Sequence, residues 1–262
     1  MARQRMLRVV AGMVLAGLVA EGCYDNKGGY GGTGPGPTYN VQVVAASGDL
    51  TAGLAQFRGL LGDSANKTAG EQPTGRREIN WDGVGAALLN VNTFPGDQFN
   101  RVVARGQVFT TPGTGFRVSD IALFDLDPSD STQFSAFSPT KIFVSVGSPI
   151  IDVTFRVAGT DTVATVTGFG VVFSDVDLAG SASLEFFDAS GASLKQVAVP
   201  VRSDAAGHSF AGAVFDAALV AKVRITAGQA PVAAGAKDIS VGGTSDLVAT
   251  DDFISGEPHR IQ

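Results

Sequence analysis

The sequence predicts an all-β protein, a jelly-roll-type antiparallel β-sandwich with a short N-terminal amphipathic helix. From residue 102 onward, short segments rich in β-branched and aromatic residues follow one another, as strands do. Turn signals built from Gly, Pro, Asp and Ser separate them at roughly the spacing of sandwich strands. The chain has 34 glycines and only 17% charged residues, which suits many short strands joined by tight turns.

The N-terminus has the pattern of an export signal. Three arginines precede an apolar run at residues 9–20, which is shorter than a membrane-spanning helix requires. Cys23, the one cysteine of the chain, follows small residues, as the lipidated cysteine of bacterial lipoproteins does. We therefore expect a signal peptide at residues 1–22 and lipidation of Cys23, with plain secretion as the alternative.

The segment after Cys23 is rich in Gly and Pro, and we expect residues 23–46 to tether a single domain, residues 47–262. On this interpretation the protein is an outer-membrane or cell-surface lipoprotein, and otherwise a secreted one. A single cysteine also excludes an internal disulfide.

A helix is predicted at residues 49–61, because apolar residues recur there on one helical face. These residues are Leu50, Leu54, Phe57 and Leu61. Strands are expected at residues 102–110, 116–119, 141–144, 152–157, 162–174, 182–187, 194–199, 208–215, 221–226 and 252–254. Residues 165–188 are interpreted as a central hairpin with Phe173 in the core, and Trp81 is expected to be a core residue.

Five strings in the chain are also informative. They are GRREINWDG (75–83), RGQVFTTPGTGFRVS (105–119), GFGVVFSDVD (168–177), KVRITAG (222–228) and DDFISGEP (251–258). Together they resemble a family of uncharacterised exported bacterial proteins. The resemblance implies export and a jelly-roll-like sandwich, and it implies no catalytic residue.

Several kinds of chemistry are excluded or disfavoured. The net charge of −6 gives no basic footprint for nucleic acid. The two histidines, His208 and His259, lie far apart in the sequence, and no HExxH or His/Cys cluster predicts zinc. The sequence has no Gly-x-Ser-x-Gly motif, and its cysteine lies at the N-terminus, so nucleophilic catalysis has no support.

Carboxylates remain as candidate ligands, for which calcium is the expected cation. Glu78 and Asp82 alternate on a predicted strand, and Asp252 opens the last one. Jelly rolls bring first and last strands together, so these three residues are the first candidate site.

A second candidate is Asp125, Asp127 and Asp130, in an oxygen-rich segment. Asp175 and Asp177 share a strand face or flank a turn. Each group has the alternative of being a solvated turn.

Three functions stay open at this point. The first is a non-catalytic cell-surface binding module, held at the membrane by its lipid and taking a glycan or a surface protein as ligand. The second is a purely structural surface lipoprotein. The third is a carboxylate-dependent polysaccharide hydrolase or lyase, which would need two carboxylates facing across a cleft.

Overall fold

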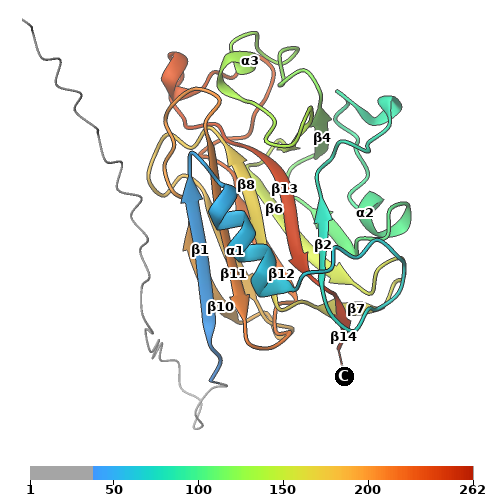
Figure 1. Ribbon diagram of the computed structural model, residues 1–262. Coiled ribbons are helices and arrows are strands. Elements are labelled where there is room, and N and C mark those ends of the chain that lie inside the picture. The colour runs from blue at the N-terminus through green and yellow to red at the C-terminus, as the bar shows by residue number, and fades with distance from the viewer. Residues whose placement is uncertain (1–37, 262) are drawn as a thin grey trace, which may run out of the picture. The chain divides into compact units, whose positions relative to one another are not determined.

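Two antiparallel sheets pack face to face in the computed structural model, which describes residues 38–261 (Figure 1). The first sheet contains β1 (Val41–Ser47), β2 (Arg76–Ile79), β4 (Gly115–Ser119), β5 (Ile142–Val146), β8 (Gly168–Ser174), β11 (His208–Phe215) and β13 (Ala249–Gly256). Its spatial order is β1-β11-β8-β13-β5-β4, with β2 beside β13.

The second sheet contains β3 (Gln107–Thr110), β6 (Ile150–Arg156), β7 (Val163–Thr165), β9 (Ser183–Phe187), β10 (Ser193–Ala198), β12 (Lys222–Thr226) and β14 (His259–Arg260). Its order is β10-β9-β12-β6-β7-β14, with β3 beside β6. Most connections carry the chain from one sheet to the other, so the predicted jelly-roll-type sandwich is confirmed.

The helices are short: α1 (Thr51–Leu61), α2 (Gln98–Arg101), α3 (Asp130–Gln133), η1 (Ala86–Leu88) and η2 (Ile239–Val241). None of those in residues 38–261 is long and apolar enough to cross a membrane.

Trp81 lies at the centre of the aromatic core between the sheets. Its side chain is fully buried and stacks on Phe143, with 4.0 Å between ring centroids. The rings of Phe94, Phe99, Phe109 and Phe253 surround it. Phe173 is fully buried in the same core, so both core predictions are confirmed.

The predicted helix forms and lies across the outer face of the first sheet (Figure 1). Phe57 on α1 is fully buried against Phe210. A Cβ at Gly170 or Gly212 would come within 3 Å of the Phe57 ring. These two strand glycines are therefore explained by the close approach of the helix.

The described domain begins earlier than predicted, at Tyr39. Residues 41–46, assigned to the tether from composition, belong to β1, which pairs with β11 along its whole length. The sequence shows no alternation of apolar and polar residues there, because β1 is an edge strand whose residues, apart from the buried Val44, are partly or fully exposed. Residues 1–22 and Cys23 lie outside the described residues.

The predicted hairpin at residues 165–188 was wrong. Its two strands, β8 and β9, belong to different sheets: β8 pairs with β11 and β13, and β9 with β10 and β12. The strand predicted at 162–174 is likewise two strands, β7 and β8, in different sheets. A strand-turn-strand pattern shows that two strands form but not which partner each one takes.

Several connections meet where β8 ends, and we call this region the loop end. Gln133 of α3 accepts hydrogen bonds from the backbone of Ala206 and from the hydroxyl of Ser240 in η2. The N–H of Asp175, directly after β8, donates to Gly207. In Figure 1, α3 lies at the opposite end of the sandwich from the C-terminus.

Candidate metal centre

Three aspartates converge at the loop end. Asp175 and Asp177 follow β8, and Asp238 precedes η2. One carboxylate oxygen from each lies within 4.8 Å of the other two. Within residues 38–261, these aspartates are the one group of three or more His, Cys, Asp or Glu side chains whose ligand atoms come this close together.

The backbone holds these carboxylates in place. Asp175 has φ of 66°, in the left-handed region that aspartate tolerates better than most residues, and this turns the chain out of β8. Asp238 accepts hydrogen bonds from the N–H groups of Ser240 and Leu247. A fourth residue, Asp246, accepts from the N–H groups that follow Val176, those of Asp177 and Leu178, at 3.0 and 2.8 Å.

Three of these four acids are buried and Asp177 is partly buried, and all but Asp238 have carboxylate oxygens without a partner. Asp175 is 1% exposed, and neither of its carboxylate oxygens has a hydrogen-bond partner. One oxygen of Asp177 and one of Asp246 are also buried without a partner. In the described part of the chain, no lysine, arginine or histidine forms an ion pair with any of the four.

Burial and mutual repulsion disfavour the charged forms. Burial, followed by the charges of Asp177 and Asp238, raises the pKa of Asp175 to about 8. Burial and the neighbouring Asp238 raise the pKa of Asp177 to about 6. Burial also raises the pKa of Asp246. These carboxylates therefore need a proton or a cation to compensate their charge.

Of the second predicted group, Asp130 belongs to α3, which contacts η2 of the loop end through Gln133 and Ser240. Asp125 pairs with Arg117, and Asp127 accepts hydrogen bonds from Ser129. Asp130 is fully buried with both carboxylate oxygens unpartnered. Its pKa is raised to about 7 by burial and then by the charges of Asp127 and Asp238.

The first predicted group is brought together only in part. β2 pairs with β13, as predicted, although β1 precedes β2 and β14 follows β13. Arg58 of α1 lies 3.0 Å from Glu78 and 3.7 Å from Asp252. Arg76 also contacts Glu78. Although burial alone would raise it, the Arg58 and Arg76 guanidinium groups hold the pKa of Glu78 below its usual value. Arginine thus supplies the charge for which calcium was predicted.

Asp82 does not join that group. Trp81 has φ of 61°, so the extended backbone ends before Asp82 and the expected strand alternation stops. The Asp82 carboxylate instead accepts two hydrogen bonds from Thr140. The prediction placed Asp82 on the face of Glu78 because a single sequence does not reveal a left-handed tryptophan.

Sequence reasoning missed Asp238 and Asp246. Both lie in a Gly- and Ala-rich segment before β13, about 60 and 70 residues after Asp175. An aspartate two residues before an N–H that it caps is a common turn signal, and Asp238 has that form. No such local pattern predicts that the turn packs against the end of β8.

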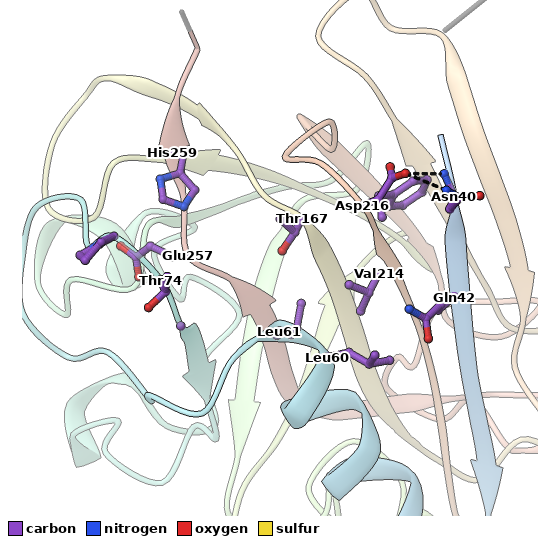
Figure 2. A pocket seen from close by; sticks show the side chains of 13 residues that line it. Asn40, Gln42, Leu60, Leu61, Thr74, Thr167, Val214, Asp216, Glu257 and His259 are labelled. Atoms are coloured by element: carbon purple, nitrogen blue, oxygen red, sulfur yellow. Dashed lines mark hydrogen bonds between the residues drawn. The ribbon is translucent and has the colours of Figure 1, made fainter. Parts of the chain in front are cut away.

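A surface cleft of about 420 Å³ lies at the other end of β8 and β11 (Figure 2). Gln42, Thr167 and Asp216 line it with polar groups, above apolar side chains that include Leu60 and Val214. Asp216 accepts two hydrogen bonds from Asn40, both at 3.0 Å.

Glu257 also lines the cleft but is almost fully buried. It accepts hydrogen bonds from Asn66, from the backbone of Gln72 and, through both oxygens, from Arg77. Its lone pairs are therefore occupied by donors of the chain itself.

Comparison with known proteins identifies no family. No family model matches the chain, and no curated protein matches it. Among solved structures, the enzymatically active domain of tailspike protein 4 from bacteriophage CBA120 matches at 14% identity, with a TM-score of 0.20. The match covers 55% of this chain and about a fifth (21%) of the tailspike chain, and at this similarity it carries no argument. The resemblance to exported bacterial proteins stays a prediction.

Proposed function

We propose that this protein is an exported, lipid-anchored module of the bacterial cell surface that binds a glycan and catalyses no reaction. The cleft in Figure 2 is the observation that carries the proposal. Its volume of about 420 Å³ lies in the range of ligand sites. The proposed anchor is Cys23, at the end of the apolar N-terminal run.

The lining of the cleft suits a sugar. Gln42 is an exposed amide on the edge strand β1, and Thr167 adds a hydroxyl from the start of β8. Leu60 and Val214 give the cleft an apolar part on which the C–H face of a sugar ring can lie. Amide and hydroxyl groups match the donors and acceptors that a sugar ring presents.

The same cleft gives hydrolysis little support. A glycosidase needs two carboxylates that are free to exchange protons with substrate. Glu257 is occupied on both oxygens, and Asp216 is held by Asn40. Binding therefore fits the observed contacts better than catalysis does.

A surface protein is the second candidate ligand, because the loop between β4 and β5 exposes apolar side chains. Phe124 is 53% exposed, and Ile121 and Phe137 are also exposed. Exposed apolar groups are more typical of protein contacts than of sugar contacts.

The binding test uses the full chain in detergent and a panel of bacterial surface glycans. Gln42→Ala should weaken binding about fivefold, since it removes one hydrogen bond to the ligand. Gln196→Ala makes the same change on the exposed face of β10, the edge strand of the other sheet, and should leave binding unchanged. Absence of binding to every glycan, or equal weakening in both variants, would overturn the glycan proposal.

The anchor is tested separately in a bacterial host. The wild-type protein should partition into the detergent phase, and Cys23→Ala should move it to the aqueous phase. A wild-type protein found wholly in the aqueous phase would contradict lipidation and favour plain secretion.

A further inference from the structure

We infer that Asp175, Asp177 and Asp238 hold a calcium ion at the loop end, with Asp246 and Asp130 beside them as further oxygen donors. This site is separate from the proposed glycan cleft, because the two lie at opposite ends of β8: Thr167 precedes the strand and Asp175 follows it.

The donor set determines the class of ion. All the converging side chains are carboxylates, and hard cations such as calcium prefer oxygen ligands. Calcium takes six to eight oxygens at flexible geometry, whereas magnesium keeps several waters and rarely uses a cage of protein carboxylates. Zinc favours nitrogen and sulfur, which this set does not offer.

A second observation separates this cluster from an ordinary acidic patch. Asp175 is 99% buried, and it has both carboxylate oxygens without a donor while one of them lies within 4.8 Å of the other two acids. A buried carboxylate without a partner is costly, so native structures rarely contain one without an ion, water or other compensation.

Asp130 and Asp246, which come from two other segments, are also buried carboxylates with oxygens that lack a donor. Both are fully buried, and between them three carboxylate oxygens lack partners. Asp246 contacts the backbone of Asp177 and Leu178, and α3, which carries Asp130, contacts η2 through Gln133 and Ser240, so both acids lie in the same region of the loop end. Five acids from the β8–β9 connection, the η2 segment and α3 thus lie in this region, three of them within 4.8 Å of one another, and none forms an ion pair with a cationic side chain of the described residues.

The N–H donors around the site keep the ligands in place before an ion arrives. Asp246 is anchored through its other oxygen by Asp177 and Leu178, and Asp238 by Ser240 and Leu247. Such outer contacts orient metal ligands and reduce the ordering needed on binding. A bound calcium ion would join three connections of the loop end into one unit.

Calcium binding is tested on the full chain in detergent, stripped with chelator and titrated with calcium chloride. Calorimetry should show one ion bound per chain. At a hundredfold excess of calcium over its dissociation constant, the midpoint of thermal unfolding should rise by roughly 5–10 °C. Absence of both the heat signal and the shift would overturn the inference.

Matched variants locate the ion. Asp175→Asn keeps the size of the side chain and tolerates the left-handed backbone, so it should fold. It should unfold at a higher temperature than the wild type in chelator, because asparagine needs neither a proton nor a cation to be buried there, and it should lose the calcium response. Asp177→Asn, at a half-exposed position, should lose the response too.

Asp252→Asn is the control, because Asp252 lies beside Arg58 in the other acidic group. It should keep the full calcium shift. A shift that survives in Asp175→Asn and Asp177→Asn but disappears in Asp252→Asn would place the ion between β2 and β13 and overturn the loop-end site.

Discussion

Two groups of buried acids in this sandwich are compensated in different ways. Around β2 and β13, the arginine-paired acids Glu78, Asp252 and Glu257 contact Arg58, Arg76 or Arg77. At the loop end, the five aspartates described above have no such partner among the described residues.

This difference shows how a protein can tolerate buried negative charge. Removing a carboxylate from water is costly unless an opposite charge or hydrogen bonds replace the lost solvation. In the first group the arginines of the chain provide that charge to Glu78 and Glu257, whereas Asp252, 3.7 Å from Arg58, keeps one buried oxygen without a partner and a pKa that its burial raises. In the second group a proton or a bound cation must provide it, so stability there depends on the solution.

The largest expected effect on stability comes from disrupting the most buried ion pair of the arginine-paired group. Arg77 and Glu257 are almost completely buried and joined by two hydrogen bonds of 2.7 and 2.6 Å. Arg77→Met leaves the Glu257 charge buried and should lower the free energy of unfolding by about 3–5 kcal/mol. Denaturant unfolding measures this change.

The control for that change is an exposed arginine. Arg101 is 59% exposed and pairs with Asp97 and Asp161 at the surface. Arg101→Met should cost less than about 1 kcal/mol, because water screens such pairs. Similar losses in both variants would mean that burial does not determine the strength of the pairing.

The next largest effect tests the comparison directly. Replacing a carboxylate by an amide should change the free energy of unfolding in opposite directions in the two groups. In chelator and above its pKa of about 7, Asp130→Asn removes an uncompensated buried charge and should raise the unfolding free energy by about 1–2 kcal/mol. Glu78→Gln weakens two arginine contacts and should lower it by about 1–2 kcal/mol. Changes of the same sign would remove the distinction between the two groups.

The smallest effect concerns His208, the one titrating base of the loop end. Burial lowers the pKa of His208, although the Ser135 carbonyl and the charge of Asp204 act in the opposite direction. The unfolded chain therefore binds more protons than the folded chain just below pH 6.5, the usual pKa of histidine. His208 therefore makes stability decrease as the pH falls through that window, whereas the raised pKa values of Asp130, Asp175 and Asp177 act in the opposite direction. In chelator, His208→Gln should therefore gain more stability than the wild type on acidification below pH 6.5. An equal or smaller gain in the variant would contradict the sign.

The fold could be predicted largely from local pattern. The apolar spacing of α1 and the β-branched runs of β8, β9, β11 and β12 indicate their own conformations, because amphipathic periodicity depends only on neighbours in the chain. The burial of Trp81 and Phe173 also followed from their residue types and places in predicted strands.

Pairing between distant segments was decided by the tertiary structure. Glu78 was predicted correctly to approach Asp252, but the cation between them, Arg58, comes from a helix about 20 residues before Glu78. Asp175 was visible in the sequence, yet its neighbours Asp238 and Asp246 were not, because nothing local to either segment specifies their contact. The sequence determines which side chains are acidic. Only the packing of the loop end decides which of them lie close enough to need a common proton or cation.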